Sequence, residues 1–252
     1  MKLKLSLIIF LFLMLPVSEV FSQELTATEI VTKADNLQRG KSSMTEMKMT
    51  VIRPKWSRTI TMKGWSLGRD YSMTLITSPA KDKGQVFLKR KNEMWNWVPT
   101  INRMIKLPPS MMSQGWMGSD YTNDDILKES SIVVDYNHKL IGEEKISGLN
   151  CYKIEMIPKE DAAVVWGKVI KWISKKEFWQ METMYYDEDD ELIRTETASA
   201  VKHFGDRDLP SHIEIVPADK PGHKTVVDVL SAGFNIKISE GFFSQQNMKR
   251  VR

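Results

Sequence analysis

The sequence has a single cysteine, Cys151, among 252 residues. One cysteine excludes an internal disulfide, so the fold has to be held by its hydrophobic core and its backbone hydrogen bonds. The net charge is only +4, and the basic residues are spread along the chain. So small an excess lacks the dense basic footprint of a nucleic-acid-binding protein, and we expect no nucleic-acid partner.

The patterns of common catalytic sites are also missing. The four histidines have no metal-ligand spacing with one another or with Cys151, and the chain has no nucleophile elbow, phosphate-binding glycine loop or His-Glu-x-x-His motif. We therefore expect no metal, no cofactor and no enzymatic activity. The alternative is a lipid- or glycan-directed enzyme that uses Asp120, because Asp124 and Asp125 are already explained as the acidic start of a helix.

The N-terminus has the pattern of a secretory signal. Lys2 and Lys4 precede an apolar run from Leu5 to Leu15, and Val20-Phe21-Ser22 precedes Gln23. We expect residues 1–22 to be a signal peptide that is cleaved near Ser22/Gln23, and residues 23–252 to form a single periplasmic domain. A retained membrane anchor is the alternative.

The mature chain begins with one amphipathic helix and continues as a β-meander. Thr26 and Glu29 have capping-box spacing, and Gly40 supplies the helix end. From Met47 onward the apolar period changes to two, with short polar turns and no helix between strands, which is typical of antiparallel sheets. Roughly eleven strands in one continuous curved sheet are predicted.

The segment from Pro108 to Asp125 interrupts this meander. Its two prolines end the preceding strand, and Met111, Met112, Trp116 and Met117 then stand between flexible positions at Gly115 and Gly118. We interpret it as a movable cover over an apolar hollow. The alternative is a connector whose side chains complete an ordinary core.

Sixteen methionines and eight tryptophans make the chain rich in large, soft apolar groups. Methionine is common where a surface has to fit several partners, whereas closed cores favour branched side chains with fixed rotamers. The composition favours a binding cavity, and a closed, methionine-rich core is the alternative.

These residues carry a family resemblance. The stretch from Gln114 to Asp125, which includes Trp-Met-Gly-Ser-Asp-Tyr, is similar to the outer-membrane lipoprotein-sorting family, the relatives of the periplasmic carrier LolA. Trp95-Asn96-Trp97-Val98-Pro99, Leu140-Ile141-Gly142-Glu143-Glu144, Cys151-Tyr152, Trp172-Ile173 and Leu209-Pro210 add support. The resemblance spans roughly residues 26 to 248.

The resemblance implies an incomplete, half-open antiparallel β-barrel with helices covering its mouth, and a cavity for acyl chains of lipoproteins or lipids. No position can be matched to the arginine that latches the lid of the carrier proper. The residues expected at the ligand or the lid are Trp95, Trp97, Met111, Met112, Trp116, Met117 and Tyr121, with Met47, Met49, Ile60 and Met62 along the wall.

The function implied is a monomeric shuttle that moves acyl chains towards the outer membrane. An inner-membrane exporter is the expected donor, and an outer-membrane protein is the expected acceptor. The alternative within the same fold is an envelope-stress sensor that detects mislocalised lipoproteins.

Overall fold

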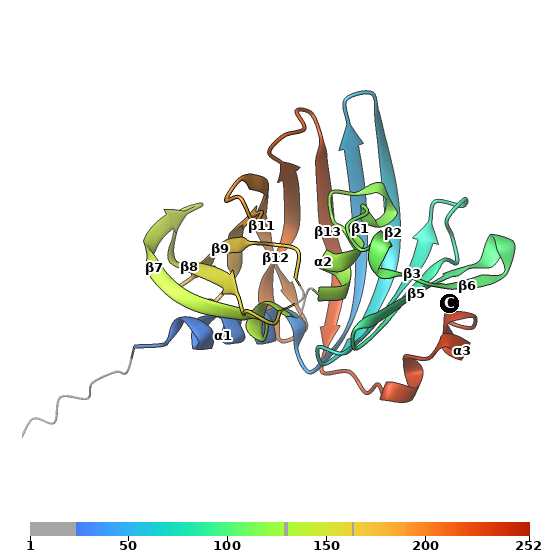
Figure 1. The fold of residues 1–252 in the computed structure, drawn as a ribbon. Coiled ribbons are helices and arrows are strands. Elements are labelled where there is room, and N and C mark those ends of the chain that lie inside the picture. The colour runs from blue at the N-terminus through green and yellow to red at the C-terminus, as the bar shows by residue number, and fades with distance from the viewer. Residues whose placement is uncertain (1–23, 129–130, 163) are drawn as a thin grey trace, which may run out of the picture.

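The computed structural model describes residues 24–128, 131–162 and 164–252, so the expected signal peptide lies outside the described residues. The described chain forms a thirteen-stranded antiparallel sheet with few helices, in the order β6-β5-β4-β3-β2-β1-β13-β12-β11-β10-β9-β8-β7. The mainly β, open antiparallel class is confirmed, with thirteen strands where roughly eleven are predicted from the sequence. Figure 1 shows the sheet curling round, with the segment that contains α2 placed between its two halves.

The strands follow one another along the chain almost without interruption. They are β1 (Ser42–Arg53), β2 (Trp56–Leu67), β3 (Tyr71–Ser78), β4 (Val86–Arg90), β5 (Glu93–Val98), β6 (Arg103–Lys106), β7 (Tyr136–Ile146), β8 (Leu149–Pro158), β9 (Lys168–Ser174), β10 (Gln180–Tyr186), β11 (Leu192–Phe204), β12 (Arg207–Pro217) and β13 (Lys224–Phe234). The helices are α1 (Ala27–Arg39), α2 (Asn123–Lys128) and α3 (Gln245–Met248).

Helix α1 begins where the sequence predicts. The side chain of Thr26 accepts a hydrogen bond from the backbone N–H of Glu29, and the Glu29 carboxylate accepts one from the N–H of Thr26 at 2.8 Å. This reciprocal pair satisfies backbone donors that a helix start otherwise leaves open. Ile30 and Val31 are buried with residues of β8 and β9, so the apolar stripe of the helix fixes it against one half of the sheet.

The register between β1 and β2 creates a wall of methionines. Met47 lies opposite Met62, and Met49 lies opposite Ile60. Because strand side chains alternate between faces, these residues share the concave face with Val51 and pack into one buried cluster beneath the 108–128 segment.

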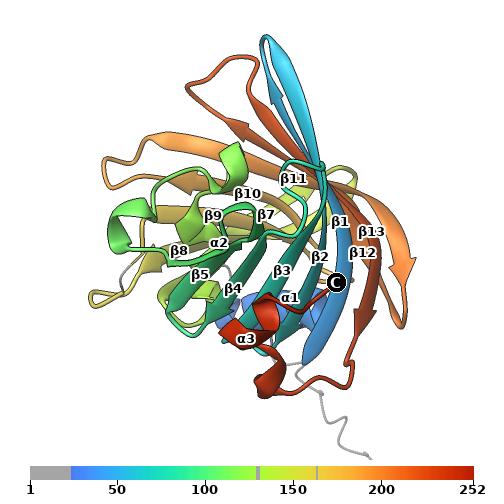
Figure 2. The same cartoon turned by 90° about the vertical axis from the view of Figure 1, so that its right-hand side faces the viewer.

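The C-terminal residues cover the outer face of the other strands. Phe243 and Met248 pack with Trp95 and Trp97 of β5, whereas Met94 of the same strand joins the inner cluster. In Figure 2, α3 lies on the outside of the sheet beside β3 and β4. This part of the sheet is therefore covered on both faces.

Within the described residues, no helix is long and apolar enough to cross a membrane.

Candidate functional site

A cavity of about 380 Å³ lies between the concave face of the sheet, helix α1 and the segment that carries α2. Its size falls in the lower part of the range for small-molecule sites. One part of its wall is apolar and includes Met47, Met49, Met62, Ile126 and Val227. The interior of the sheet is thus not completely filled by its own side chains.

The structure brings most of the predicted residues together at this cavity. Met47, Met49, Met62, Trp116 and Tyr121 line it directly. Ile60 is fully buried in the same apolar cluster, and Met112 and Met117 pack against that cluster from the overlying segment.

Three predicted residues lie elsewhere. Trp95 and Trp97 face away from the cavity, because alternation along β5 points Met94 inward and leaves the two indoles under the C-terminal tail. Met111 is half-buried and does not line the cavity, and its carbonyl accepts a hydrogen bond from Asn123 Nδ2 at 2.8 Å. Side-chain alternation places the two tryptophans on one face of β5, but it does not say which face of the sheet is concave.

We call residues 108–128 the cover. Its central loop is tight, because Trp116 N donates to Tyr121 O at 2.6 Å and Ser119 Oγ donates to Trp116 O at 2.7 Å. A Cβ on Gly115 would lie 2.8 Å from Ser119 O, so the loop closes only with glycine at that position. Trp116 packs edge-on against Phe87 of β4, with ring centroids 5.3 Å apart. The cover is therefore an ordered element seated on the sheet.

Asp120 ties the central loop of the cover to the sheet. Its Oδ2 accepts hydrogen bonds from Arg53 at 3.0 Å and from Thr225 Oγ1 at 2.6 Å, and Arg53 also donates to Gly118 O at 2.9 Å. The Arg53 and Asp120 side chains are about nine-tenths buried. These contacts give Asp120, the carboxylate considered for catalysis, a role in holding the loop.

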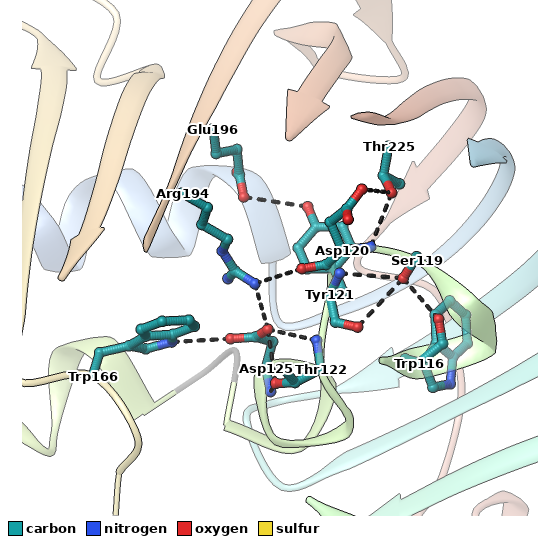
Figure 3. Close-up of polar contacts among 10 residues, drawn as sticks. All are labelled: Trp116, Ser119, Asp120, Tyr121, Thr122, Asp125, Trp166, Arg194, Glu196 and Thr225. Carbon is teal, nitrogen blue, oxygen red and sulfur yellow. Dashed lines mark hydrogen bonds and ion pairs between the residues drawn. The ribbon is translucent and has the colours of Figure 1, made fainter. Parts of the chain in front are cut away.

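Arg194 of β11 forms a second tie to the cover, at the start of α2. It donates to Asp125 Oδ2 at 2.6 Å and to the carbonyl of Asp120 at 2.9 Å, as Figure 3 shows. Asp125 Oδ1 in turn accepts a hydrogen bond from Trp166 Nε1 at 3.0 Å. Burial alone would lower the pKa of Arg194, but Asp125 and the neighbouring acidic groups outweigh it and raise that pKa, so the guanidinium stays charged.

A polar pole occupies the cavity wall near Arg194, formed by Glu196, Lys171, Gln180 and the hydroxyl of Tyr121. Tyr121 Oη donates to Glu196 Oε2 at 3.3 Å, and Lys171 donates to Gln180. Glu196 keeps part of its surface open to the cavity, but the surrounding protein withdraws it from bulk water. This burial raises the pKa of Glu196, against the opposing effect of Lys171 and Arg194.

Sequence reasoning missed the two arginines that hold the cover, and it missed the polar pole. A signal existed for Arg194 and Glu196, since they alternate on one face of a strand with Ile193 and Thr195. Charged residues at alternate positions are ordinarily assigned to the solvent face. Only the curvature of the sheet shows that this face is the inner one.

An open antiparallel sheet curled round a covered cavity is the architecture of the LolA-like fold. A family described as "Uncharacterized protein"-like matches residues 68–250, which is more than half of the chain. The chain belongs to that family. A comparison with curated proteins found no match.

Three solved structures share the fold. A DUF1329 family protein from Desulfovibrio piger has a TM-score of 0.80 at 22% identity and covers 88% of this chain and 97% of its own. A domain described as outer membrane lipoprotein-sorting, from Vibrio parahaemolyticus, has a TM-score of 0.79 at 22% identity, covering 89% and 98%. A LolA superfamily protein from Nitrosomonas europaea has a TM-score of 0.76 at 23% identity, covering 88% and 99%. The predicted LolA-like fold is confirmed.

Proposed function

We propose that the protein is a periplasmic carrier that binds acyl chains of lipoproteins or lipids in the covered cavity and shuttles them towards the outer membrane. The observation that carries the proposal is the methionine wall of Met47, Met49 and Met62, which faces open space beneath the cover. Methionine side chains adapt to flexible apolar guests better than branched side chains do.

Partial enclosure suits a carrier that has to release its cargo. Each methylene removed from water gains about 0.8 kcal/mol, so full enclosure of some thirty methylenes would gain on the order of 20 kcal/mol. That value reaches the practical ceiling of non-covalent affinity, and such a complex would not dissociate. A cavity of about 380 Å³ at the mouth of an open sheet encloses only part of such a cargo.

The cover supplies the gate in this proposal. Opening it would break the contacts of Arg53 with Asp120 and of Arg194 with Asp125, while Gly118, which has a positive φ of 76°, would provide backbone freedom in the loop. The two arginines would hold the cover closed, as a latch does. The binding free energy of cargo against the apolar wall would compensate for the loss of these contacts. The direction of cargo transfer would be set by the relative affinities of the donor and the acceptor for the cargo.

The polar pole favours an amphipathic cargo. Lys171, Glu196 and Arg194 line the cavity from β9 and β11, whereas the methionines line it from β1 and β2, on the other side of β13 and β12 in the sheet. An acyl chain would lie along the methionine wall with its polar attachment near the charged groups. Binding of this kind needs no chemical step, and the proposed protein acts without a cofactor as a monomer between a membrane exporter and an outer-membrane acceptor.

A cavity-filling substitution tests the proposal without deleting any packing. Ala198 of β11 lines the cavity, while its neighbour Thr197 is exposed on the opposite face. Ala198→Phe should weaken binding of a fluorescent fatty acid about tenfold or more, because the added ring occupies the space of several methylenes. Thr197→Phe is the matched control and should bind like the wild type.

Mass spectrometry of organic extracts from gently purified protein would identify the cargo. Acyl-bearing molecules in stoichiometric amount are expected from the wild type, and fewer from Ala198→Phe. If a folded Ala198→Phe variant bound fatty acid with the affinity of the wild type, the cavity would not be the binding site.

A further inference from the structure

Two neighbouring hairpins rise beside the cover at one end of the sheet. The β1–β2 hairpin and the β12–β13 hairpin project beyond the other elements in both views (Figures 1 and 2). Their tips are packed together: a Cβ on Gly222 would lie 3.2 Å from Pro54 Cγ, and Arg53 donates to Lys224 O at 3.4 Å. They therefore form one double tip, made of residues 53–58 and 217–224.

An exposed indole stands on this double tip. Trp56 is 51% exposed, although tryptophans elsewhere in the described chain are at least half-buried. The Arg53 guanidinium lies 5.9 Å from the centre of its ring, and a shallow groove runs between Trp56, Lys55 and His223. The exposed part of the Trp56 indole does not contribute to the core, so this apolar surface is free to contact a binding partner.

The double tip also has an excess of basic side chains in a chain whose charges are otherwise nearly balanced. Residues 53–58 and 217–224 contain five Lys or Arg and one Asp. Three of the basic side chains are paired with acidic groups outside the tip: Arg53 with Asp120, Arg58 with Asp82 and Lys224 with Glu214. Among the described residues, neither Lys55 nor Lys220 takes part in an ion pair, and both are exposed. Lys81 and Lys83 stand exposed on the adjoining β3–β4 turn, which Arg58 contacts through Asp82.

We propose that the double tip docks on the surface of an anionic phospholipid bilayer, with Trp56 at the headgroup level and Lys55 and Lys220 against the lipid phosphates. Tryptophan is enriched at this level of membranes because its ring has an apolar body and one polar N–H. Clustered Lys and Arg next to such an anchor are attracted by negatively charged lipids. Charge complementarity favours this surface over a neutral one.

The tip is connected to the cover through Arg53, so docking would bring a bilayer close to the cover. Arg53 belongs to the tip and at the same time holds the cover through Gly118 and Asp120. A bilayer bound at the tip therefore lies next to one of the two contacts that close the cavity. The inference goes beyond the carrier function, because docking needs neither cargo nor an open cavity.

The test is flotation of the purified protein with phosphatidylcholine vesicles that contain or lack phosphatidylglycerol. We expect binding to the anionic vesicles alone, and weaker binding at high salt. Trp56→Ala and Lys55→Ala should each weaken binding about fivefold, which corresponds to about 1 kcal/mol. Their thermal unfolding should be unchanged, since both side chains are exposed.

Matched controls lie away from the tip. Leu230→Ala removes an apolar side chain that is 52% exposed on β13, and Lys176→Ala removes a side chain that is 90% exposed in the β9–β10 turn at the other end of the sheet. Both should float like the wild type. Fatty-acid binding in solution by Trp56→Ala should also be unchanged, which separates this inference from the carrier function.

Three outcomes would overturn the docking proposal. The first is a wild type that floats with neither kind of vesicle. The second is that Trp56→Ala and Lys55→Ala bind the anionic vesicles as well as the two control variants do. The third is a tip that binds a purified envelope protein but no vesicle, which would assign the surface to a protein partner.

Discussion

Arg194 and Asp125 form a buried ion pair across the cavity, with Nη1 and Oδ2 2.6 Å apart and side-chain exposures of 3% and 8%. The same Asp125 oxygen accepts hydrogen bonds from the backbone N–H of Thr122 at 2.7 Å and from its hydroxyl at 2.8 Å. One carboxylate therefore starts helix α2 and fastens the cover to β11. Local helix formation and closure of the cavity are coupled through it.

Loss of the Arg194–Asp125 ion pair should lower the stability of the protein. We expect Arg194→Gln to lower the free energy of unfolding by about 3 kcal/mol, because the substitution leaves the Asp125 charge buried without its partner. A double-mutant cycle with Asp125→Asn, measured by urea unfolding, should give a coupling energy of about 1 kcal/mol or more. The exposed Arg103→Gln is the control and should change stability by less than about 0.5 kcal/mol. Additive effects in the cycle would contradict the latch.

Gly115→Ala should disturb the cover while leaving the rest of the sheet intact. The added Cβ would lie 2.8 Å from the Ser119 carbonyl oxygen, so the loop has to shift away from its contacts. A loss of on the order of 2 kcal/mol is expected, together with faster hydrogen exchange in residues 114–122. Gly241→Ala is the control, because the nearest atom to its added Cβ is 3.8 Å away. Unchanged exchange in the cover would show that the loop tolerates the side chain.

Glu196 should make stability depend on pH in a defined direction. Burial raises the pKa of Glu196 in the folded state, so ionisation opposes folding as the pH rises from the ordinary glutamate range through the raised pKa. Glu196→Gln removes this cost and can still accept the hydrogen bond from Tyr121. We expect the variant to be more stable than the wild type at neutral pH, with the difference shrinking at acid pH.

Thermal unfolding across the pH range measures this difference. Glu188→Gln, on the exposed tip of the β10–β11 hairpin, controls for the loss of one negative charge. A variant that is less stable than the wild type at neutral pH would mean that Lys171 and Arg194 hold Glu196 in its ionised form.

His212 should also make stability fall as the pH rises, but here the charged form of the side chain is the one that stabilises the fold. Its Nδ1 is 2.7 Å from Asp228 and its Nε2 is 3.3 Å from Glu214, and the Asp228 contact is the largest cause of the raised pKa of His212. The stabilisation is complete below the ordinary histidine pKa and is lost as the pH rises through the raised value. His212→Asn should therefore cost stability at about pH 5 and less at about pH 9. The side chain is one-third exposed, so the effect should not exceed about 1 kcal/mol. A pH-independent cost would indicate packing as the cause.

Much of the fold could be predicted from local patterns. The capping box at Thr26 starts α1, and the alternation around Met47, Met49 and Met62 places these residues on one face. Both are properties of neighbouring residues, and hydrogen bonding and side-chain alternation act over that short range. The unusual composition of the loop around Trp116 and Tyr121 predicts a site there, and both residues line the cavity.

The remainder depends on contacts between distant parts of the chain. Arg53 and Asp120 are 67 positions apart, and Arg194 and Asp125 are 69 positions apart. No local pattern connects such residues. For the same reason the sequence does not predict that Trp95 and Trp97 lie under the C-terminal tail and not at the cavity.

The sequence by itself determined the alternating strands, the single N-terminal helix and the abundance of soft apolar side chains. The tertiary structure decided which face of each strand is concave, because curvature arises from the pairing of all thirteen strands and not from any one of them. It also decided that the cover is held by two arginines, since a buried charge is stable only where folding brings its partner within hydrogen-bonding distance.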